Sequence, residues 1–150
     1  MKGGKRDANE MRTFVEEYVK ALNSNDVNAV ERFHSDISVS KSGGQPGSGM
    51  KRAQRQQYFK QRQRAFPDFQ MTVSKIDVDP RSGRATFEWD VISTHAGHFK
   101  GVPPTHRRVT HHGTTELLIR NGKIITETSY QDMAAFMKQL LGDDSTAQSA

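Results

Sequence analysis

THAGHFKGVPPT, residues 94–105, is the most informative stretch of this chain. Its glycines and prolines predict a connection built from turns, because these two residue types interrupt helices and strands. The segments on either side, residues 85–95 and 109–120, alternate apolar and polar side chains with a period of two. Such alternation is typical of strands with one buried face. We therefore expect two antiparallel strands joined by this connection.

Two further strands extend the expected sheet. Residues 69–78 alternate in the same way, and the turn sequence DPRSG at residues 79–83 leads from them to the next strand. Residues 124–130 follow Asn121-Gly122, a dipeptide that is the strongest short signal for a hairpin. The second half of the chain is therefore expected to form four successive antiparallel strands.

Helices are expected to precede the sheet. Residues 8–22 carry apolar side chains at intervals of three and four, which predicts a helix with one buried stripe. Asp26 is placed to cap a second, short helix. Residues 37–41 then alternate as a short strand, and the Gly-, Ser- and Pro-rich residues 42–49 predict a loop. The buried positions of the first helix are expected to be Met11, Phe14, Val15, Tyr18, Val19 and Leu22.

A third helix, residues 51–65, is strongly basic. We expect Ser48 as its N-cap and Pro67 as its terminator. Cations occur all round this helix instead of forming one stripe, which favours a solvated helix face over a nucleic-acid groove. The chain contains none of the common nucleic-acid-binding motifs, and nucleic acid is therefore not an expected partner.

The last helix, residues 133–141, is expected to begin after Asp132 as its N-cap and to end at Gly142. Helices that come first and an antiparallel sheet that follows predict an α+β fold in which the helices cover one sheet face. The apolar residues 117–119 would point to both faces of that sheet. Because an apolar outer face requires a cover, we expect a homodimer.

The composition indicates one folded domain. With 150 residues the chain has the length of one domain, which we place at residues 9–142 between tails at residues 1–8 and 143–150. The absence of cysteine excludes disulfides and thiolate chemistry. No apolar run approaches the roughly 20 residues that cross a bilayer. We expect a soluble cytoplasmic protein, and the net charge of +5 weakly favours anionic partners.

Three segments together resemble the SnoaL-like polyketide cyclase family of the nuclear transport factor 2 fold. Phe-Pro-Asp at residues 66–68 follows the third helix, and residues 94–105 match the family pattern Thr-His-x-Gly-x-x-x-Gly-x-Pro-Pro-Thr. Residues 122–124 and 139–142 match the family's last hairpin and closing helix. Their order and spacing agree over residues 10–142, so the resemblance covers most of the chain.

The resemblance implies a cone-shaped α+β fold. In such a cone, a curved antiparallel sheet packs against the N-terminal helices and encloses a cavity for a hydrophobic, often polycyclic ligand. In the cyclases an aspartate acts as acid and base in an intramolecular aldol ring closure on an anthraquinone-type ester, without a metal or a cofactor. The resemblance therefore implies no cofactor and a hydrophobic small molecule as the partner.

The acid and base residues of the cyclases are missing at the matching positions. The position of the cyclase aspartate is Ser129 here, and that of its partner histidine is Thr115. A serine hydroxyl does not accept a proton near neutral pH without a base beside it. Two hypotheses follow, a cofactor-independent cyclase or isomerase with other proton-handling residues, and a non-catalytic binding or accessory protein that keeps the cone.

Glu127 is the candidate that replaces the missing carboxylate. If Thr115 and Ser129 face the cavity, the period of two places Glu127, Leu117 and His111 on the same inner face. We expect Glu127 and His111 to be the catalytic pair that moves protons. The alternative for Glu127 is a glutamate at the cavity rim that pairs with an arginine.

Other side chains are candidates for weaker reasons. Asp132 is a possible catalytic carboxylate near the cavity floor, although helix capping explains it better. His95 belongs to the turn pattern and is expected to make a structural hydrogen bond there. We expect no metal site, because the adjacent pair His111-His112 would diverge on a strand. The expected ligand-binding residues are Tyr18, Tyr58, Trp89, His95, Thr115, Leu117 and Ser129.

Overall fold

The computed structural model describes residues 7–43 and 49–142. The predicted tails, except for Asp7 and Ala8, lie outside these ranges, and so does the predicted cap Ser48. The helices are α1 (Ala8–Leu22), α2 (Val27–Glu31), α3 (Arg52–Ala65) and α4 (Met133–Leu141). The strands are β1 (His34–Ser42), β2 (Gln70–Asp79), β3 (Arg84–Thr94), β4 (Arg108–Arg120) and β5 (Lys123–Gln131).

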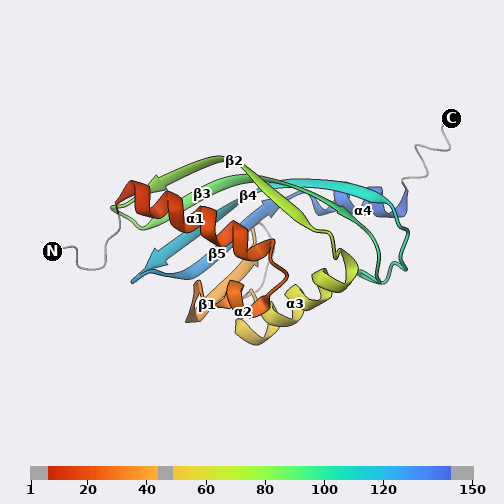
Figure 1. Ribbon diagram of the computed structural model, residues 1–150, viewed down its shortest axis with the longest axis horizontal. Coiled ribbons are helices and arrows are strands. Elements are labelled where there is room, and N and C mark those ends of the chain that lie inside the picture. Colours follow the sequence, from red (N-terminus) through yellow and green to blue (C-terminus); the bar gives the residue numbers. More distant parts are fainter. Residues whose placement is uncertain (1–6, 44–48, 143–150) are drawn as a thin grey trace.

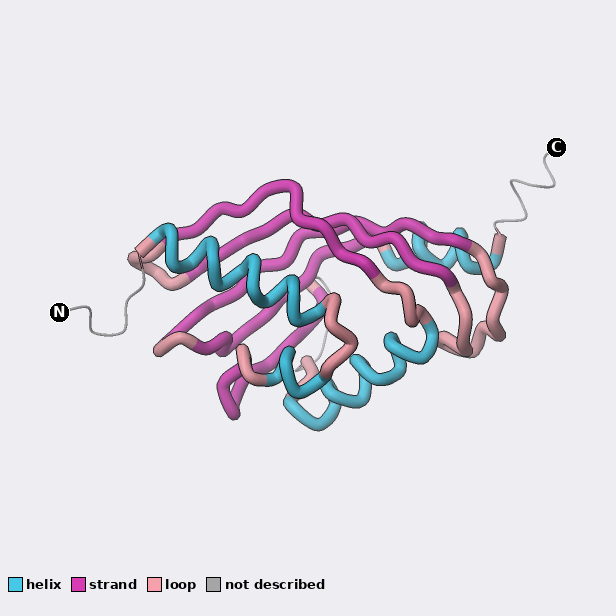
Figure 2. The backbone as a smooth tube through the Cα atoms, in the orientation of Figure 1, coloured by secondary structure: helices cyan, strands magenta, loops and turns pink. Residues whose placement is uncertain are grey.

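The five strands form one curved sheet in the order β1-β5-β4-β3-β2 (Figure 2). Neighbours from β2 to β5 run antiparallel, and β1 pairs with β5 in parallel. Figure 1 shows α1, α2 and α3 together on one side of this sheet, while α4 lies at the end where the chain reaches its carboxyl terminus. The predicted α+β fold with N-terminal helices packed against a curved sheet is confirmed.

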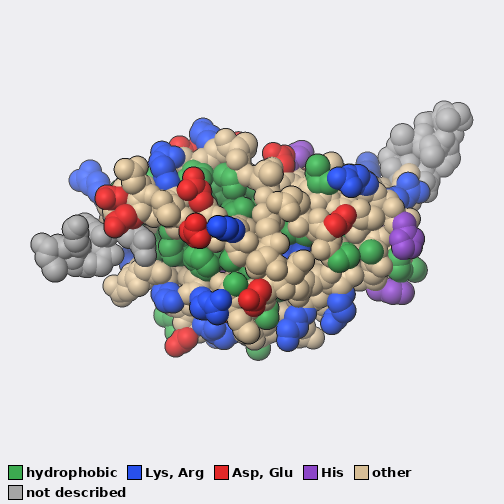
Figure 3. All heavy atoms as spheres, in the orientation of Figure 1, with side chains coloured by type: hydrophobic (Ala, Val, Ile, Leu, Met, Phe, Trp, Pro, Cys, Tyr) green, Lys and Arg blue, Asp and Glu red, His purple; other side chains and the backbone are tan. Residues whose placement is uncertain are grey.

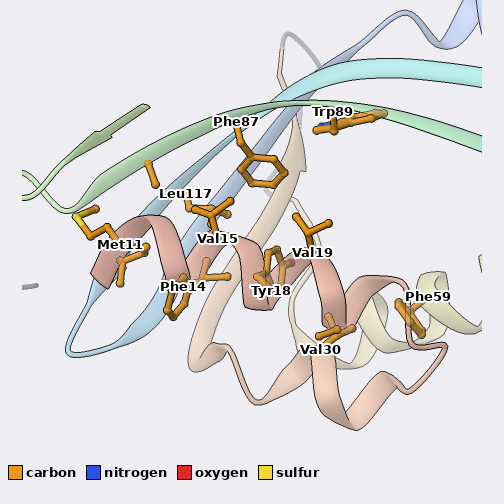
Figure 4. Packing of buried hydrophobic residues seen from close by; sticks show 14 of the residues in the cluster. Met11, Phe14, Val15, Tyr18, Val19, Val30, Phe59, Phe87, Trp89 and Leu117 are labelled. Atoms are coloured by element: carbon orange, nitrogen blue, oxygen red, sulfur yellow. The ribbon is translucent and has the colours of Figure 1, made fainter. Parts of the chain in front are cut away.

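Helix α1 begins and packs as its sequence predicts. Asp7 caps it by accepting a hydrogen bond from the Glu10 N–H, and the Glu10 carboxylate accepts one from the Asp7 N–H. Its buried stripe meets side chains of β3 and β4, and Figure 4 shows this cluster between helix and sheet. The labelled residues are Met11, Phe14, Val15, Tyr18, Val19, Val30, Phe59, Phe87, Trp89 and Leu117.

Two expectations need correction. Strand β1 begins at His34 instead of residue 37, because its first residues pair with β5 across a register irregularity that hides the period of two. Helix α3 does not present all its cations to solvent, since Arg55 and Arg62 are buried. Figure 3 shows Lys and Arg side chains spread over the visible face with acidic side chains between them.

The connection at residues 94–105 packs onto the end of α3 and the loop behind it. Asp68 accepts hydrogen bonds from the N–H and the hydroxyl of Thr94, both at 2.7 Å. The ring of His95 stacks on Phe66, and its Nδ1 lies 3.0 Å from the Thr105 hydroxyl. A Cβ at Gly97 would lie 2.5 Å from a carbonyl oxygen of α3, so only glycine permits this approach. The predicted structural hydrogen bond of His95 is therefore present.

Helix α4 is attached to the sheet by its glutamine. The side chain of Gln139 accepts a hydrogen bond from the Thr110 N–H at 2.9 Å and donates one to the Thr110 carbonyl at 2.7 Å. Phe136 and Leu140 of the same helix pack with Phe66 and Val109 in a second core cluster. Asp132 caps the helix as predicted, through a bond from the Ala135 N–H.

Some apolar side chains lie on the outer face of the sheet. Leu117 and Ile119 are buried on the inner side, and Leu118 between them is half-buried on the other side. The exposed Ile92 lies on the outer side of β3. The homodimer stays a prediction. Among the described helices, none is both long and apolar enough to cross a membrane.

Replacing Asp68 with alanine should lower the free energy of unfolding by about 1 kcal/mol at pH 7, because two hydrogen bonds to Thr94 are lost. Partial burial works to raise the pKa of the Asp68 carboxyl, but the bonds from Thr94 outweigh it and leave the pKa below its usual value. The contribution is therefore present above about pH 4 and disappears as the pH falls further.

Urea unfolding of wild type and variant from pH 7 down to pH 3 tests this. The exposed Asp77 of β2 supplies the control, and Asp77→Ala should change stability by less than about 0.5 kcal/mol. A constant difference between wild type and Asp68→Ala across the whole pH range would contradict the role given to Asp68.

Candidate active site

A cavity of about 500 Å³ lies between the helices and the concave face of the sheet. Most of its wall is apolar, with contributions from Leu22, Phe59, Phe69, Met71, Phe87 and Phe136. Polar and ionisable side chains line the rest. Those predicted from the sequence are Tyr18, Tyr58, Trp89, His111, Thr115, Glu127 and Ser129.

Glu127 lies on this wall and is held by two hydroxyl groups. Tyr18 of α1 donates a hydrogen bond to its Oε2 at 2.6 Å, and Ser40 of β1 donates one to its Oε1 at 2.7 Å. The β1–β5 register, in which Ser40 lies beside Glu127, accounts for the second bond. Within the described chain Glu127 forms no ion pair with an arginine, so the alternative of an arginine-paired glutamate at the rim is wrong.

His34 lies behind Tyr18 and was not found from the sequence. Its Nε2 is 3.0 Å from the Tyr18 hydroxyl and 3.8 Å from Glu127 Oε1, while its Nδ1 is 2.7 Å from the Ser38 hydroxyl. Burial, and after it the nearby Arg55, lowers the pKa of His34 to about 3. The ring is therefore neutral at physiological pH and takes part in the network by hydrogen bonding.

A buried ion pair borders the same end of the cavity. The guanidinium of Arg55 makes two hydrogen bonds of 2.8 Å to the two carboxylate oxygens of Glu31 and a third to the Ser38 carbonyl. Both side chains line the cavity. The fork of Arg55 is already bound to Glu31, and Arg55 makes no direct ion pair with Glu127.

Thr115 and Ser129, which stand at the positions of the cyclase acid and base, belong to a chain of hydrogen bonds between neutral groups. The Trp89 indole donates to the Thr115 hydroxyl at 2.8 Å, and that hydroxyl lies 2.9 Å from the Ser129 hydroxyl. Gly113 faces Trp89 across the β3–β4 ladder, and a Cβ there would lie 2.6 Å from the indole ring. Trp89, Thr115 and Ser129 form part of the cavity wall, and their polar groups bond to one another.

His111 lines the cavity at the other end. Its ring stacks on Phe136 at 4.5 Å and meets Trp89 edge-on at 5.4 Å. Its buried Nε2 makes no hydrogen bond within the described chain, and burial, then the neighbouring His112, lowers its pKa to about 4.

The expected pair of Glu127 and His111 does not form a contact. Leu117 pairs with Glu127, and His111 lies six residues from Leu117 along β4, or about 20 Å at roughly 3.3 Å per residue. The two side chains serve different ends of one cavity, and the histidine beside Glu127 is His34.

Three predicted site residues lie outside the cavity lining. Leu117 is completely buried in the main core, and His95 is completely buried beside Phe66. The carboxylate of Asp132 caps α4. In the described parts of the chain, no three His, Asp or Glu side chains come together in a way that could hold a metal ion.

The comparisons with known proteins agree with this geometry. A family model of the SnoaL-like polyketide cyclases matches residues 12–140. The chain belongs to the SnoaL-like polyketide cyclase family. The resemblance predicted from residues 66–68, 94–105, 122–124 and 139–142 is thereby confirmed. No curated protein matches this SnoaL-like chain significantly.

Solved structures show the same fold along most of this SnoaL-like chain. AclR from Streptomyces galilaeus, a candidate hydroxylase, is 27% identical, with a TM-score of 0.80 over 91% of this chain and 98% of its own. IdmH from Streptomyces antibioticus, a candidate polyketide cyclase, is 22% identical, with a TM-score of 0.75 over 87% and 98%. A candidate SnoaL-like cyclase from Jannaschia sp. CCS1 is 15% identical, with a TM-score of 0.78 over 90% and 95%.

Acid should destabilise this protein through His34. The unfolded chain binds a proton at His34 below about pH 6.5, whereas the folded protein resists protonation until about pH 3. Stability is therefore lost as the pH falls from 6.5 toward 3, by at most about 5 kcal/mol from this residue. His34→Gln should be less stable at pH 7, because hydrogen bonds are lost, but its stability should depend less steeply on pH.

Urea unfolding of both proteins at pH 7, 6, 5 and 4 measures the two slopes. His111 also has a lowered pKa and therefore contributes to the loss of stability in acid, and this contribution remains in the His34→Gln variant. His98→Gln removes an exposed histidine and is expected to keep the wild-type slope. Equal slopes for His34→Gln and wild type would show that His34 is not held neutral by the fold.

Proposed function

We propose that this protein is a cofactor-independent cyclase or isomerase in which Glu127 moves a proton on a hydrophobic, carbonyl-rich small molecule. The observation that carries the proposal is a carboxylate on the wall of a mostly apolar cavity of about 500 Å³. Tyr18 and Ser40 each use one acceptor site of that carboxylate. Each oxygen retains a second lone pair that can face the ligand.

Proton transfer to and from Glu127 would be sufficient for an intramolecular ring closure. The carboxylate takes a proton from a carbon next to a ligand carbonyl, and the electron pair left behind forms an enolate spread over the conjugated ligand. The enolate carbon then bonds to a second carbonyl carbon of the same molecule. The oxygen of that carbonyl takes the proton back from Glu127, so the protein ends as it began.

The network behind Glu127 supports its use as a base. A carboxylate that accepts hydrogen bonds from two hydroxyl groups is held in one orientation, which reduces the entropy lost when it meets the ligand. His34 fixes Tyr18 from behind at 3.0 Å. Tyr18 itself stays protonated, because burial, and after it the charge of Glu127, raises its pKa well above the usual value.

The opposite end of the cavity suits recognition of a neutral ligand group. The unpartnered Nε2 of His111 lies buried there beside the rings of Phe136 and Trp89. We assign His111 to binding a ligand carbonyl or hydroxyl, and Trp89, Thr115 and Ser129 to the wall against which the ligand stacks.

A non-catalytic binding protein is the second candidate. It is favoured by the pair Thr115 and Ser129, whose hydroxyls bond to each other where the cyclases carry their acid and base. On this hypothesis the cavity binds a ligand without converting it, and Glu127 only contributes a polar contact.

Replacing Glu127 with glutamine distinguishes the two candidates. The substitution keeps the size of the side chain and one acceptor oxygen, while its amide NH2 donates a hydrogen bond to the other hydroxyl group, and it removes the base. Turnover of polyketide-like carbonyl compounds, followed by mass spectrometry of the products, should fall by about 10² to 10⁴. The melting shift caused by the same compounds should persist.

The matched control is Glu116→Gln on β4, which removes the same charge at a residue that does not line the cavity. It should keep wild-type turnover. Unchanged turnover in Glu127→Gln would reject Glu127 as the base, and a ligand-induced melting shift without any product in the wild type would favour the binding protein.

A further inference from the structure

Two buried arginines of α3 line the cavity, and they differ in how their charges are compensated. Arg55 and Arg62 are seven residues apart, so they lie on the same face of the helix about 10 Å from each other along its axis. They are 6% and 8% exposed. Arg55 is neutralised by Glu31 through two hydrogen bonds of 2.8 Å. Arg62 has no acidic partner within the described residues.

The contacts of Arg62 are neutral. One terminal nitrogen donates to the Leu22 carbonyl at 3.1 Å, and the other makes a long bond of 3.4 Å to the side-chain oxygen of Asn25. A guanidinium carries five N–H donors, so most of them are not used by these two acceptors. The bond to Leu22, the last residue of α1, helps to end that helix but leaves the charge uncompensated.

The surroundings compensate this charge only in part, through two aromatic rings that attract the guanidinium without neutralising it. The guanidinium carbon lies 3.9 Å from the centre of the Phe69 ring and 4.7 Å from that of Phe59. A buried cation without an anion loses hydration that neutral hydrogen bonds replace only in part. Burial lowers the pKa of Arg62 to about 10, which still leaves it charged at neutral pH.

The geometry around Arg62 suits a planar anion. Its guanidinium carbon lies over two aromatic rings, and its N–H groups are the part of the side chain that can bind polar partners. Two parallel N–H groups match the two oxygens of a carboxylate. Tyr58 lies one helical turn before Arg62, lines the same cavity, and its hydroxyl makes no hydrogen bond within the described residues.

We propose that Arg62 binds the carboxylate of a hydrophobic carboxylic acid, so that the cavity takes a free acid in preference to its ester or amide. The carboxylate would lie about two helical turns from the Arg55 and Glu127 end of the cavity, with the apolar body of the ligand between them. This inference rests on the proposed function only in taking the cavity as the ligand site.

The test compares one ligand in two charge states. Anthraquinone-2-carboxylic acid and its methyl ester have nearly the same apolar body, and only the acid is an anion at pH 7. Trp89, the single tryptophan of the chain, lines the cavity and reports binding by its fluorescence. The wild type should bind the acid about ten- to a hundredfold more tightly than the ester.

Variants at position 62 should change this preference selectively. Arg62→Gln should reduce the preference to less than about threefold while ester affinity changes little, because only the contact with the anion is lost. Arg62→Lys keeps a charge without the planar fork and should keep part of the preference. Lys60→Gln removes an exposed cation from the same helix and should behave as the wild type.

The outcomes separate this inference from the proposed function. Equal binding of acid and ester by the wild type, or an undiminished preference in Arg62→Gln, would overturn the role of Arg62 and leave the cavity as a ligand site. Failure of both compounds to bind the wild type would overturn the inference together with the proposed function. If Arg62→Gln does not fold, judged by its melting curve, an undiminished preference in Arg62→Lys overturns the proposed fork and a reduced one supports it.

Discussion

The hydroxyl group of Tyr18 joins helix α1 to the sheet at one end of the cavity. It donates to Glu127 on β5 and contacts His34 on β1, so three elements meet at one buried oxygen. Ser38 and Ser40 of β1 complete the network. If α1 packed on the sheet through apolar side chains alone, these side chains would fill the space between the two layers. The polar contact of Tyr18 instead holds α1 against the sheet at the edge of the cavity.

The polar wall costs stability that the apolar core must offset. Glu31, Arg55 and Arg62 are buried, and the desolvation of such charges is repaid only where the geometry of their partners is good. Glu31 and Arg55 meet this condition, because two hydrogen bonds join their charged groups. Arg62 meets it only in part, because its partners are neutral oxygens. Groups with incomplete partners inside a cavity are typical of sites at which a ligand supplies the remaining contacts.

Thr115 and Ser129, the positions that match the acid and base of the cyclases, lie on the cavity wall. Thr115 and Ser129 satisfy each other and Trp89 with neutral hydrogen bonds, so the acid and base positions of the cyclases became part of the structural lining. Glu127 lies two residues from Ser129 on the same strand and lines the same cavity. The chain therefore combines the fold of the family with a carboxylate at another position of β5, and a shared fold does not by itself fix the chemistry.

The sequence by itself determined the elements and the family. Helix α1 and helix α4 have the predicted ends, because caps and apolar periodicity act between residues close in the chain. Glu127 and His111 were correctly expected on the cavity wall, since alternation along a strand is also local. Only the tertiary structure decided that His34 and not His111 lies beside Glu127, and that Glu31 pairs with Arg55. Such pairs join residues on different elements, and their distances depend on strand register and helix packing, which local periodicity does not encode.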